Sequence, residues 1–340
     1  MPIVSQPLLF DTYLRPQIWG GVALARSLGK GSDETAKIGE AWELSTLQEH
    51  LSRVTIGPCS GESLVDLWAR SRVEISGTKS TGDPFPWLVK WLDCTLDLSL
   101  QVHPSDDQAQ SESGLPNGKS EVWIVVHASP DARIVSGIRE GVSVAEVKSR
   151  LHDQTIEQCL NSYQPQAGDC ISLPAGTIHT ARGVVLAEVQ QPSDATFRLF
   201  DWNRRDASGQ TRTLHLESGL RAINWSLGTI QPVTPILLDS IDNAAAGELL
   251  LQTSWVRLER HVVKQSWPVP YPDEMTVWMV LEGNAMLFDQ AHDFRYQLQR
   301  GTTVLIPAAA KEIHWSPRMT DSSCTLACIR RPQSKIAMAF

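Results

Sequence analysis

The sequence predicts an all-β protein: a small β-barrel with short helical insertions, followed by a second, smaller β domain. Runs of apolar and β-branched residues such as Val122–Val126 alternate with turn residues over most of the chain, which is typical of strands. Gly168, Pro174 and Gly176 punctuate a tight turn that ends at His179. Features of this central region return near the end of the chain, which indicates a repeated β unit.

The repeat consists of two similarities. Val122-Trp123-Ile124-Val125 resembles Val277-Trp278-Met279-Val280, and the spacing of Gly168 and Pro174 returns in Gly301 and Pro307. The polar residues of the first copy are not repeated, since Thr276 stands where Glu121 stands. We therefore expect a catalytic domain over residues 1–235 and a degenerate copy over residues 236–340. Chance similarity between strands is the alternative interpretation.

The first hundred residues read as short extended pieces with one helix. A strand is expected over residues 39–45, where Glu40 and Glu43 either reach a pocket or face solvent at a sheet edge. Leu64, Leu67 and Trp68 recur at helical spacing, which predicts a short helix over residues 62–72. Residues 85–93 form an apolar run interrupted by a lysine, and we expect a buried strand there.

The next elements follow from similar patterns. Residues 105–113 are polar and predict a short helix or loop. Ser143 and Glu146 fit a capping box, and Val147 and Leu151 continue at helical spacing. This helix is expected to separate the strand at Val122 from a strand at residue 170. Strands over residues 184–190 and 196–202 follow, and the glycine and prolines of residues 228–235 predict a linker.

Composition excludes some classes of function. The chain has 340 residues, 42% of them hydrophobic, a formal net charge of −8 and a pI near 5.6. An acidic chain is a poor nucleic-acid binder, although a small basic pocket for an anionic metabolite remains compatible with it. No basic leader or long apolar run is present, so we expect a cytoplasmic protein without a membrane partner. The six scattered cysteines predict buried thiols.

One set of polar residues suits a divalent metal. In a strand, alternate side chains share a face, so Gln101 and His103 point the same way. Glu121 begins a second strand, and His179 ends the glycine- and proline-rich turn. Two imidazoles, a carboxylate and an amide oxygen form a ligand set that leaves an open coordination position.

The spacing Gly168-(x)5-Pro174-x-Gly176-x-x-His179 resembles the second signature of the cupin β-barrels. The first cupin signature is usually a His-x-His followed closely by a glutamate. Here Gln101 replaces the first histidine, and Glu121 lies farther downstream.

With these departures, the sequence resembles the type I mannose-6-phosphate isomerases in their short bacterial form. The resemblance is strong from about residue 85 to residue 204 and diffuse outside this region. It rests on three stretches: residues 88–104, which lead from Lys90 to His103; Lys119-Ser120-Glu121; and residues 188–202, which include Ser193, Asp194 and Arg198.

The resemblance implies a cupin-type jelly-roll barrel, and the internal repeat predicts a smaller, cupin-like β domain after it. It implies one Zn²⁺ per chain, held by Gln101, His103, Glu121 and His179. It also implies an active-site Arg198 with Lys119 and Glu188 nearby. The implied reaction interconverts mannose 6-phosphate and fructose 6-phosphate, a step in carbohydrate metabolism.

This aldose–ketose exchange proceeds through an enediolate, whose negative charge a metal and a guanidinium both stabilise. Glu188, Lys119 and a metal-bound water are all candidates for the general acid–base, and the sequence does not choose among them. A cationic clamp for the phosphate would come from Arg198 or Lys90 as substrate-binding residues. Arg204 and Arg205 are expected to be exposed, although either can contribute to phosphate binding.

Two alternatives remain open. The first is a metal cupin with a different reaction on a sugar phosphate, such as an epimerase or a dioxygenase. The second is a non-catalytic sugar-phosphate-binding cupin. Gln101 argues against redox chemistry, which favours more histidine ligands, and the set of Lys119, Glu188 and Arg198 argues against loss of catalysis. The oligomeric state does not follow from the sequence.

Overall fold

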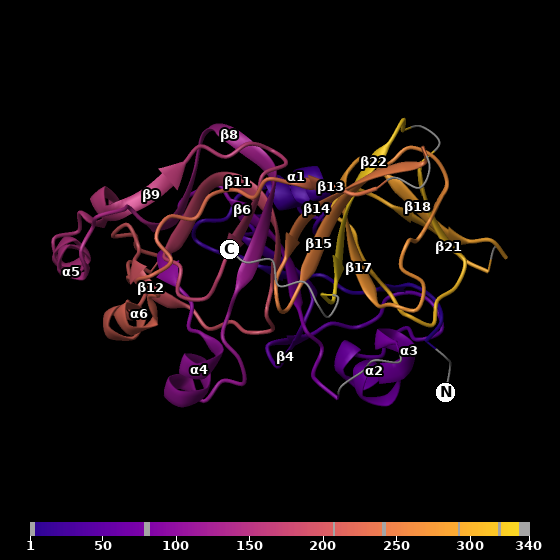
Figure 1. The fold of residues 1–340 in the computed structure, drawn as a ribbon, viewed down its shortest axis with the longest axis horizontal. Helices are drawn as coiled ribbons and strands as arrows, with labels where there is room; N and C mark the ends of the chain where they lie inside the picture. The colour runs from indigo at the N-terminus through magenta and orange to yellow at the C-terminus, as the bar shows by residue number, and fades with distance from the viewer. Residues whose placement is uncertain are drawn as a thin grey trace.

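Two β-barrels lie side by side in the computed structural model, which describes residues 4–77, 82–206, 208–239, 243–291, 293–318 and 321–332 (Figure 1). The predicted all-β class with a second β domain is confirmed. The helices are short and lie at the edges: α1 (Ala23–Leu28), α2 (Leu64–Arg70), α3 (Arg72–Ser76), α4 (Asp106–Gln108), a π-helix (Ala109–Ser113), α5 (Val144–His152), a 3-10 helix (Ile156–Cys159) and α6 (Leu216–Ala222).

A curled nine-stranded sheet forms the first barrel. Its main path runs β10-β8-β11-β6-β3-β2; β7 pairs with β11 and β12, and β9 pairs with β8. The long strand β8 extends well beyond the predicted Val122–Val126 run and changes register twice against β11. The strands are β2 (Tyr13–Arg15), β3 (Glu40–Leu44), β6 (Leu88–Cys94), β7 (Leu100–Val102), β8 (Glu121–Ile138), β9 (Leu160–Tyr163), β10 (Cys170–Leu173), β11 (His179–Gln190) and β12 (Phe197–Phe200). The short hairpin β4 (Thr46–Leu47) and β5 (His50–Leu51) lies apart.

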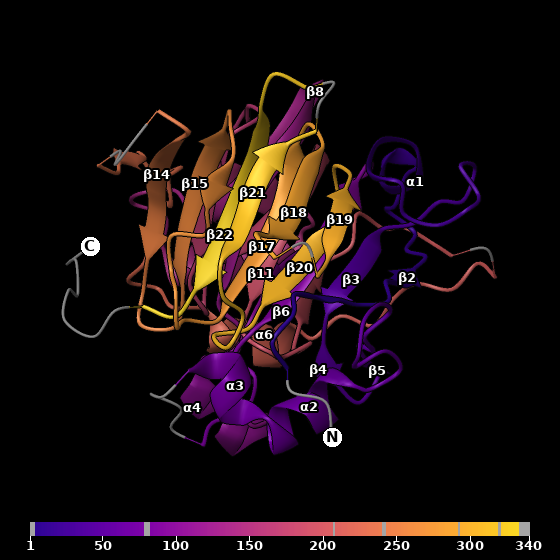
Figure 2. The ribbon, with the colours of Figure 1, turned by 90° about the vertical axis from the view of Figure 1, so that its right-hand side faces the viewer.

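The second barrel consists of two sheets, which face the viewer in Figure 2. The larger runs β1-β20-β17-β22-β15-β14-β13 and the smaller β16-β21-β18-β19. The larger sheet contains β1 (Leu8–Leu9), β13 (Ile236–Leu237), β14 (Ala245–Gln252), β15 (Arg257–Val263), β17 (Thr276–Glu282), β20 (Thr303–Ile306) and β22 (Cys324–Arg330). The smaller contains β16 (Trp267–Pro268), β18 (Ala285–Asp289), β19 (Arg295–Leu298) and β21 (Ile313–Pro317).

The two main sheets repeat the same strand order. The path β10-β8-β11-β6-β3-β2 corresponds to β20-β17-β22-β15-β14-β13. The similar sequences around Trp123 and Trp278 lie on the equivalent strands β8 and β17. Strand β1 pairs with β20, with Leu8 opposite Leu305, so a segment from the start of the chain completes the second sheet. The division at residue 235 therefore stays a prediction.

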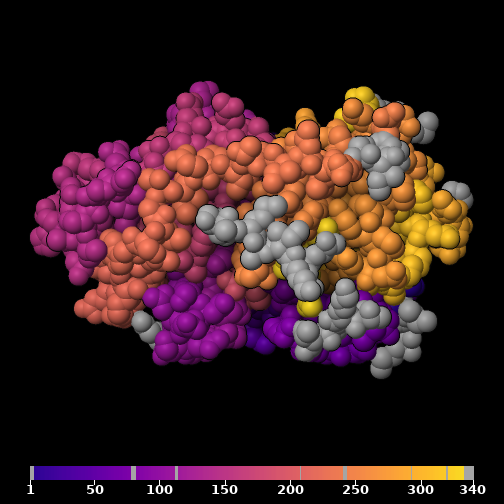
Figure 3. Space-filling model, in the orientation of Figure 1, coloured from indigo at the N-terminus to yellow at the C-terminus, as the bar shows by residue number. Residues whose placement is uncertain are grey.

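A shared apolar core joins the barrels. Trp91 and Ala187 from the first sheet belong to the same buried cluster as Val277 and Ile329 from the second. Because side chains alternate along a strand, the neighbouring Leu92 points instead into the interior of the first barrel, where it joins a separate cluster. The two barrels form one continuous body in the space-filling view (Figure 3).

The insertion after β8 follows its sequence signals. The Ser143 side chain accepts the backbone N–H of Glu146 and caps α5, whose buried face carries Val147 and Leu151, so the predicted helix is confirmed. The Glu146 carboxylate accepts from Arg150 one turn later. All six cysteines are buried free thiols. In the described ranges, no helix is both long and apolar enough to cross a membrane.

Candidate active site

The predicted metal ligands converge in the first barrel. Strand β7 and the residue after it carry Gln101 and His103, which share a face, while Val102 points into an apolar cluster on the other side. Glu121 begins β8, and His179 begins β11 directly opposite Gln101. Ligand atoms of His103, Glu121 and His179 all lie within 4.8 Å of one another.

The turn before His179 has the geometry that its glycine predicts. Gly176 has φ +88°, a left-handed conformation that side chains rarely adopt. Its N–H donates to the carbonyl of His103 at 2.9 Å, and its carbonyl accepts the N–H of Asn224 at 3.0 Å. These bonds tie together the backbone segments that carry the two histidines.

Backbone carbonyls orient both imidazoles. Nδ1 of His103 lies 2.8 Å from the carbonyl of Ala195, and Nδ1 of His179 lies 2.9 Å from that of Thr177. A carbonyl only accepts, so each Nδ1 carries the proton and each Nε2 keeps its lone pair for a ligand. Burial and the charge of Lys119 lower the pKa of His103 to about 3, which keeps that ring neutral.

The residues present fit a metal ion. Both carboxylate oxygens of Glu121 are buried without a well-aligned hydrogen bond. Nε2 of Gln101 lies 3.1 Å from Nε2 of His179, and turning the amide over would place Oε1 there instead. A carboxylate, two neutral imidazole nitrogens and an amide oxygen can thus meet at one point, as a divalent ion requires.

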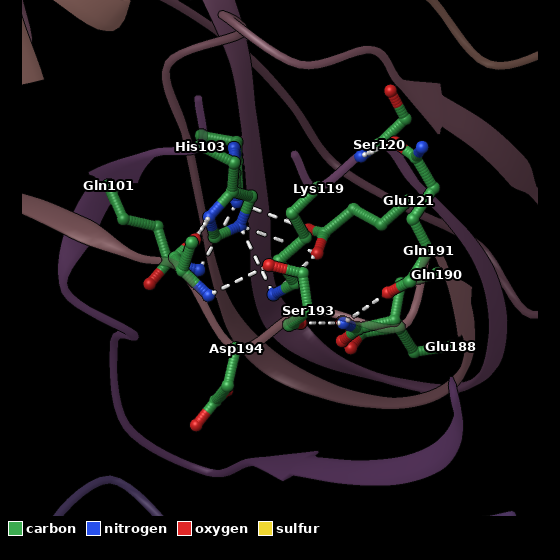
Figure 4. Close-up of polar contacts among 12 residues, drawn as sticks. Gln101, His103, Lys119, Ser120, Glu121, Glu188, Gln190, Gln191, Ser193 and Asp194 are labelled. Carbon is green, nitrogen blue, oxygen red and sulfur yellow. Dashed lines mark hydrogen bonds and ion pairs between the residues drawn. The ribbon is translucent and has the colours of Figure 1, made fainter. Parts of the chain in front are cut away.

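Lys119 extends into the same site. Its Nζ lies 2.9 Å from Oε2 of Glu121 and 3.2 Å from Nε2 of His103 (Figure 4). Burial raises the pKa of Glu121, but the charge of Lys119 outweighs that effect and holds the pKa well below its usual range. Lys119 and Glu121 therefore form a charged buried pair.

A cavity of about 240 Å³ opens beside these residues. Its wall includes Lys90, whose Nζ lies 3.4 Å from Glu188 and 3.6 Å from Glu40. Lys90 is only 2% exposed, so it is buried among carboxylates and does not reach solvent. Burial and the charge of Glu121 raise the pKa of Glu188, whose Oε2 accepts the indole N–H of Trp123 at 2.7 Å.

Arg198 lines the same cavity. It lies on β12 directly opposite Gln101 of β7, so it adjoins the candidate metal ligands. Its Nη1 donates to the carbonyl of Thr213, and its buried Nε has no hydrogen-bond partner within the described part of the chain. Arg204 is half-buried and pairs with Asp201, whereas it was expected to be exposed; Arg205 is exposed.

Sequence reasoning missed several residues of this cavity, among them Arg15, Gln17, Ser99 and Arg212. Arg15 lies 3.4 Å from both Glu40 and Asp194, and Gln17 donates to Glu40. Arg15 and Gln17 alternate before Trp19, which is a pattern typical of a strand. The sequence therefore offered a signal for these two residues. No local pattern distinguishes Arg212, which lies in a loop.

Comparison with known proteins agrees with this geometry. Residues 8–117 match the family model described as phosphomannose isomerase type I, catalytic domain. Mannose-6-phosphate isomerase ManA of Bacillus subtilis (strain 168) is 34% identical over 222 residues, which cover 65% of this chain and 69% of that protein. A mannose-6-phosphate isomerase of Streptococcus mutans is 33% identical over 69% of this chain and 72% of that protein.

The fold has a solved counterpart. The crystal structure of the mannose 6-phosphate isomerase from Bacillus subtilis superposes with a TM-score of 0.86 at 26% identity, and the match covers 96% of this chain and 100% of that one. That similarity extends over both barrels.

Proposed function

Because the chain belongs to the type I phosphomannose isomerase family, we propose that it is an isomerase that interconverts mannose 6-phosphate and fructose 6-phosphate. The observation that carries the proposal is the convergence of His103, Glu121 and His179 beside a cavity that also contains Glu188 and Arg198. A small-molecule sugar phosphate is the partner that follows, and a cytoplasmic location is part of the same proposal.

We propose zinc as the resident ion, with Gln101, His103, Glu121 and His179 as its ligands. Zinc needs no redox step and tolerates a fifth ligand, so it would supply Lewis-acid polarisation of the sugar oxygens. The carbonyl hydrogen bonds of the two histidines support this choice, since they leave both Nε2 atoms available.

Glu188 is the proposed group that moves the proton between C1 and C2. Its Oε1 is buried without a hydrogen bond, and its pKa is raised, which brings a carboxyl closer to the pH at which it can both take and return a proton. Lys90 lies beside it and can hold the carboxylate in place. Lys119 already pairs with Glu121, so it is better suited to orienting substrate oxygens.

Arg198 is the proposed stabiliser of the enediolate. Its position opposite Gln101 brings a guanidinium next to the metal ligands, and no carboxylate among the described residues forms an ion pair with it. A fixed cation in a partly dehydrated pocket stabilises charge that develops on the sugar oxygens.

The test is an assay of the purified protein with mannose 6-phosphate, coupled to detection of fructose 6-phosphate. We expect turnover that a chelator abolishes and added zinc restores. Turnover of another sugar phosphate, with none of mannose 6-phosphate, would favour a different metal-cupin reaction. Binding without turnover would favour a non-catalytic sugar-phosphate-binding protein.

A further inference from the structure

Three arginines surround one carboxylate at the side of the cavity. Asp201, which is buried at the end of β12, accepts from Arg204 at 2.6 Å and from Nε and Nη2 of Arg212 at 2.8 and 2.5 Å. Arg198 is the third arginine, and among the described residues its side chain donates only to the backbone carbonyl of Thr213. Three positive charges and one negative charge leave this cluster with a formal charge of +2.

The positive charges act on one another. Burial lowers the pKa of Arg198, the charges of Arg212 and Arg204 lower it further, and Asp201 only partly opposes them. The Nε of Arg198 is buried without a partner. A buried donor that is left unpaired costs free energy, and an anion in the cavity would remove that cost.

The cavity wall carries charges of both signs. Glu40, Glu188 and Asp194 line it, and each forms an ion pair with Lys90 or Arg15, whereas Arg198 has no carboxylate partner among the described residues. Lys90 is held between two of these carboxylates, so its charge is already balanced. A doubly charged anion in the cavity is therefore attracted most strongly to Arg198 and Arg212, whose charges Asp201 only partly balances.

We propose that Arg212 binds the phosphate group of the substrate, while Arg198 stays with the reacting carbons, and that Arg212 thereby selects phosphorylated over free sugars. This inference rests on the proposed function and names the residues of one end of its substrate site. Asp201 occupies one edge of the Arg212 guanidinium, which leaves Nη1 without a partner among the described residues. Arg204 and Asp201 are positioning residues that fix the direction of that free end.

Arg198 lies near both the candidate metal ligands and Arg212. Arg198 adjoins the metal ligand Gln101 across two paired strands, whose opposed Cβ atoms are about 5 Å apart. Arg212 also lines the cavity, and its charge acts on Arg198, so the two guanidinium groups lie near each other. In the proposed pose, the reacting carbons of the sugar lie toward Gln101 and its phosphate lies toward Arg212. A planar guanidinium suits phosphate oxygens better than an ammonium.

Arg212→Gln in the metal-loaded protein tests the proposal, with Arg205→Gln as the matched control. Arg205 lies in the same loop, is exposed and donates to the carbonyl of Gly209. Two properties are measured: the affinity for inorganic phosphate, as a dissociation constant from calorimetry, and the turnover of mannose 6-phosphate and of mannose, as kcat and KM. We expect Arg212→Gln to raise the phosphate dissociation constant and the KM of mannose 6-phosphate about 10- to 100-fold.

The same variant should leave kcat within a few-fold of the parent and leave the low rate with mannose unchanged. Arg205→Gln should change neither quantity. Arg204→Gln should raise KM less, and should add nothing in the double variant with Arg212→Gln. Unchanged phosphate affinity in Arg212→Gln would overturn the proposal, even if the protein proves to act on another sugar.

Arg212→Lys is the control for a folding defect, because it keeps the charge but loses the planar guanidinium. It should melt like the parent and show an intermediate rise in KM. A lysine variant with parental KM and phosphate affinity would mean that Arg212 only contributes general charge, and the assigned contact would be wrong. If mannose 6-phosphate is not turned over at all, the proposed function fails while the phosphate titration still decides the role of Arg212.

Discussion

Lys90 in the first barrel and Glu259 in the second occupy equivalent positions. Lys90 lies on β6 opposite Glu188 of β11, and Glu259 lies on β15 opposite Cys328 of β22. Both pairs lie in strands that hold the same place in the two repeated sheets. The second barrel therefore has a carboxylate where the candidate active site has an ammonium.

Glu259 is fully enclosed by donors. Arg257 and Arg330 bind one of its oxygens at 2.5 and 3.2 Å, while His261 at 3.2 Å and Tyr271 bind the other. Burial raises the pKa of Glu259, but the hydrogen bonds from His261 and Tyr271 and the charge of Arg330 outweigh it and lower the pKa to about 2. The second barrel therefore carries a buried cluster of ion pairs and hydrogen bonds around Glu259.

Glu259→Gln should therefore destabilise the fold at neutral pH by about 3 kcal/mol. The folded pKa lies below the unfolded value, so the stabilisation is complete above about pH 4.5 and is lost as the pH falls toward 2. Urea unfolding at several pH values measures this difference. Glu282→Gln, at an exposed position of β17, is the control. A difference in the free energy of unfolding between parent and variant that grows as the pH falls would contradict the assignment.

His103→Ala should lower metal affinity by orders of magnitude, because the remaining ligands no longer close the site. Elemental analysis and competition with a chelator measure the effect. His152→Ala removes an exposed imidazole from α5 and should keep full metal content. A complete metal complement in His103→Ala would refute the ligand assignment.

Arg198→Ala should lower kcat for mannose 6-phosphate about 10²–10³-fold, because a preorganised donor to the developing charge is lost. Arg198→Lys should also be impaired, since it loses the planar fork. Metal content and thermal melting should stay near the parent values. Arg182→Ala, on the exposed part of β11, should retain activity. Near-normal turnover in Arg198→Ala would exclude a role of Arg198 in stabilising the developing charge. Unfolding of this variant would instead indicate that Arg198 stabilises the fold.

Glu188→Gln should lower kcat about 10²–10⁴-fold with little change in KM, because the amide cannot exchange a proton. The glutamine can keep the hydrogen bond that Glu188 accepts from Trp123. Steady-state kinetics at fixed metal occupancy measures the effect, with the exposed Glu157→Gln as control. Parental kcat in Glu188→Gln would move the acid–base role to another group.

Gly176→Ala should weaken both the fold and the metal site. The new Cβ would lie 2.6 Å from Cβ of Asn224 at a φ of +88°, so the turn before His179 must shift. Gly141→Ala is the matched control, because its φ is +81° but nothing lies within 4 Å of the added atom. Both variants should lose about 1–3 kcal/mol through strain. Only Gly176→Ala should lose metal affinity, and equal affinities would show that the turn tolerates the clash.

Local chemistry allowed much of the site to be predicted. The common face of Gln101 and His103 follows from strand alternation, and the placement of His179 follows from a turn that needs a left-handed glycine. The cap of α5 by Ser143 is equally local. Each depends on residues a few positions apart, so backbone geometry alone decides it.

Tertiary structure decided the rest. The sequence by itself determined which side chains are available and how each local segment folds, but not which distant segments meet. Lys90 acquires its two carboxylates only because β3 and β11 pair on either side of β6, and Arg212 reaches the cavity only because Asp201 holds it. Strand pairing depends on the burial of whole sheet faces, including the core shared by the two barrels, and that burial is a property of the complete fold.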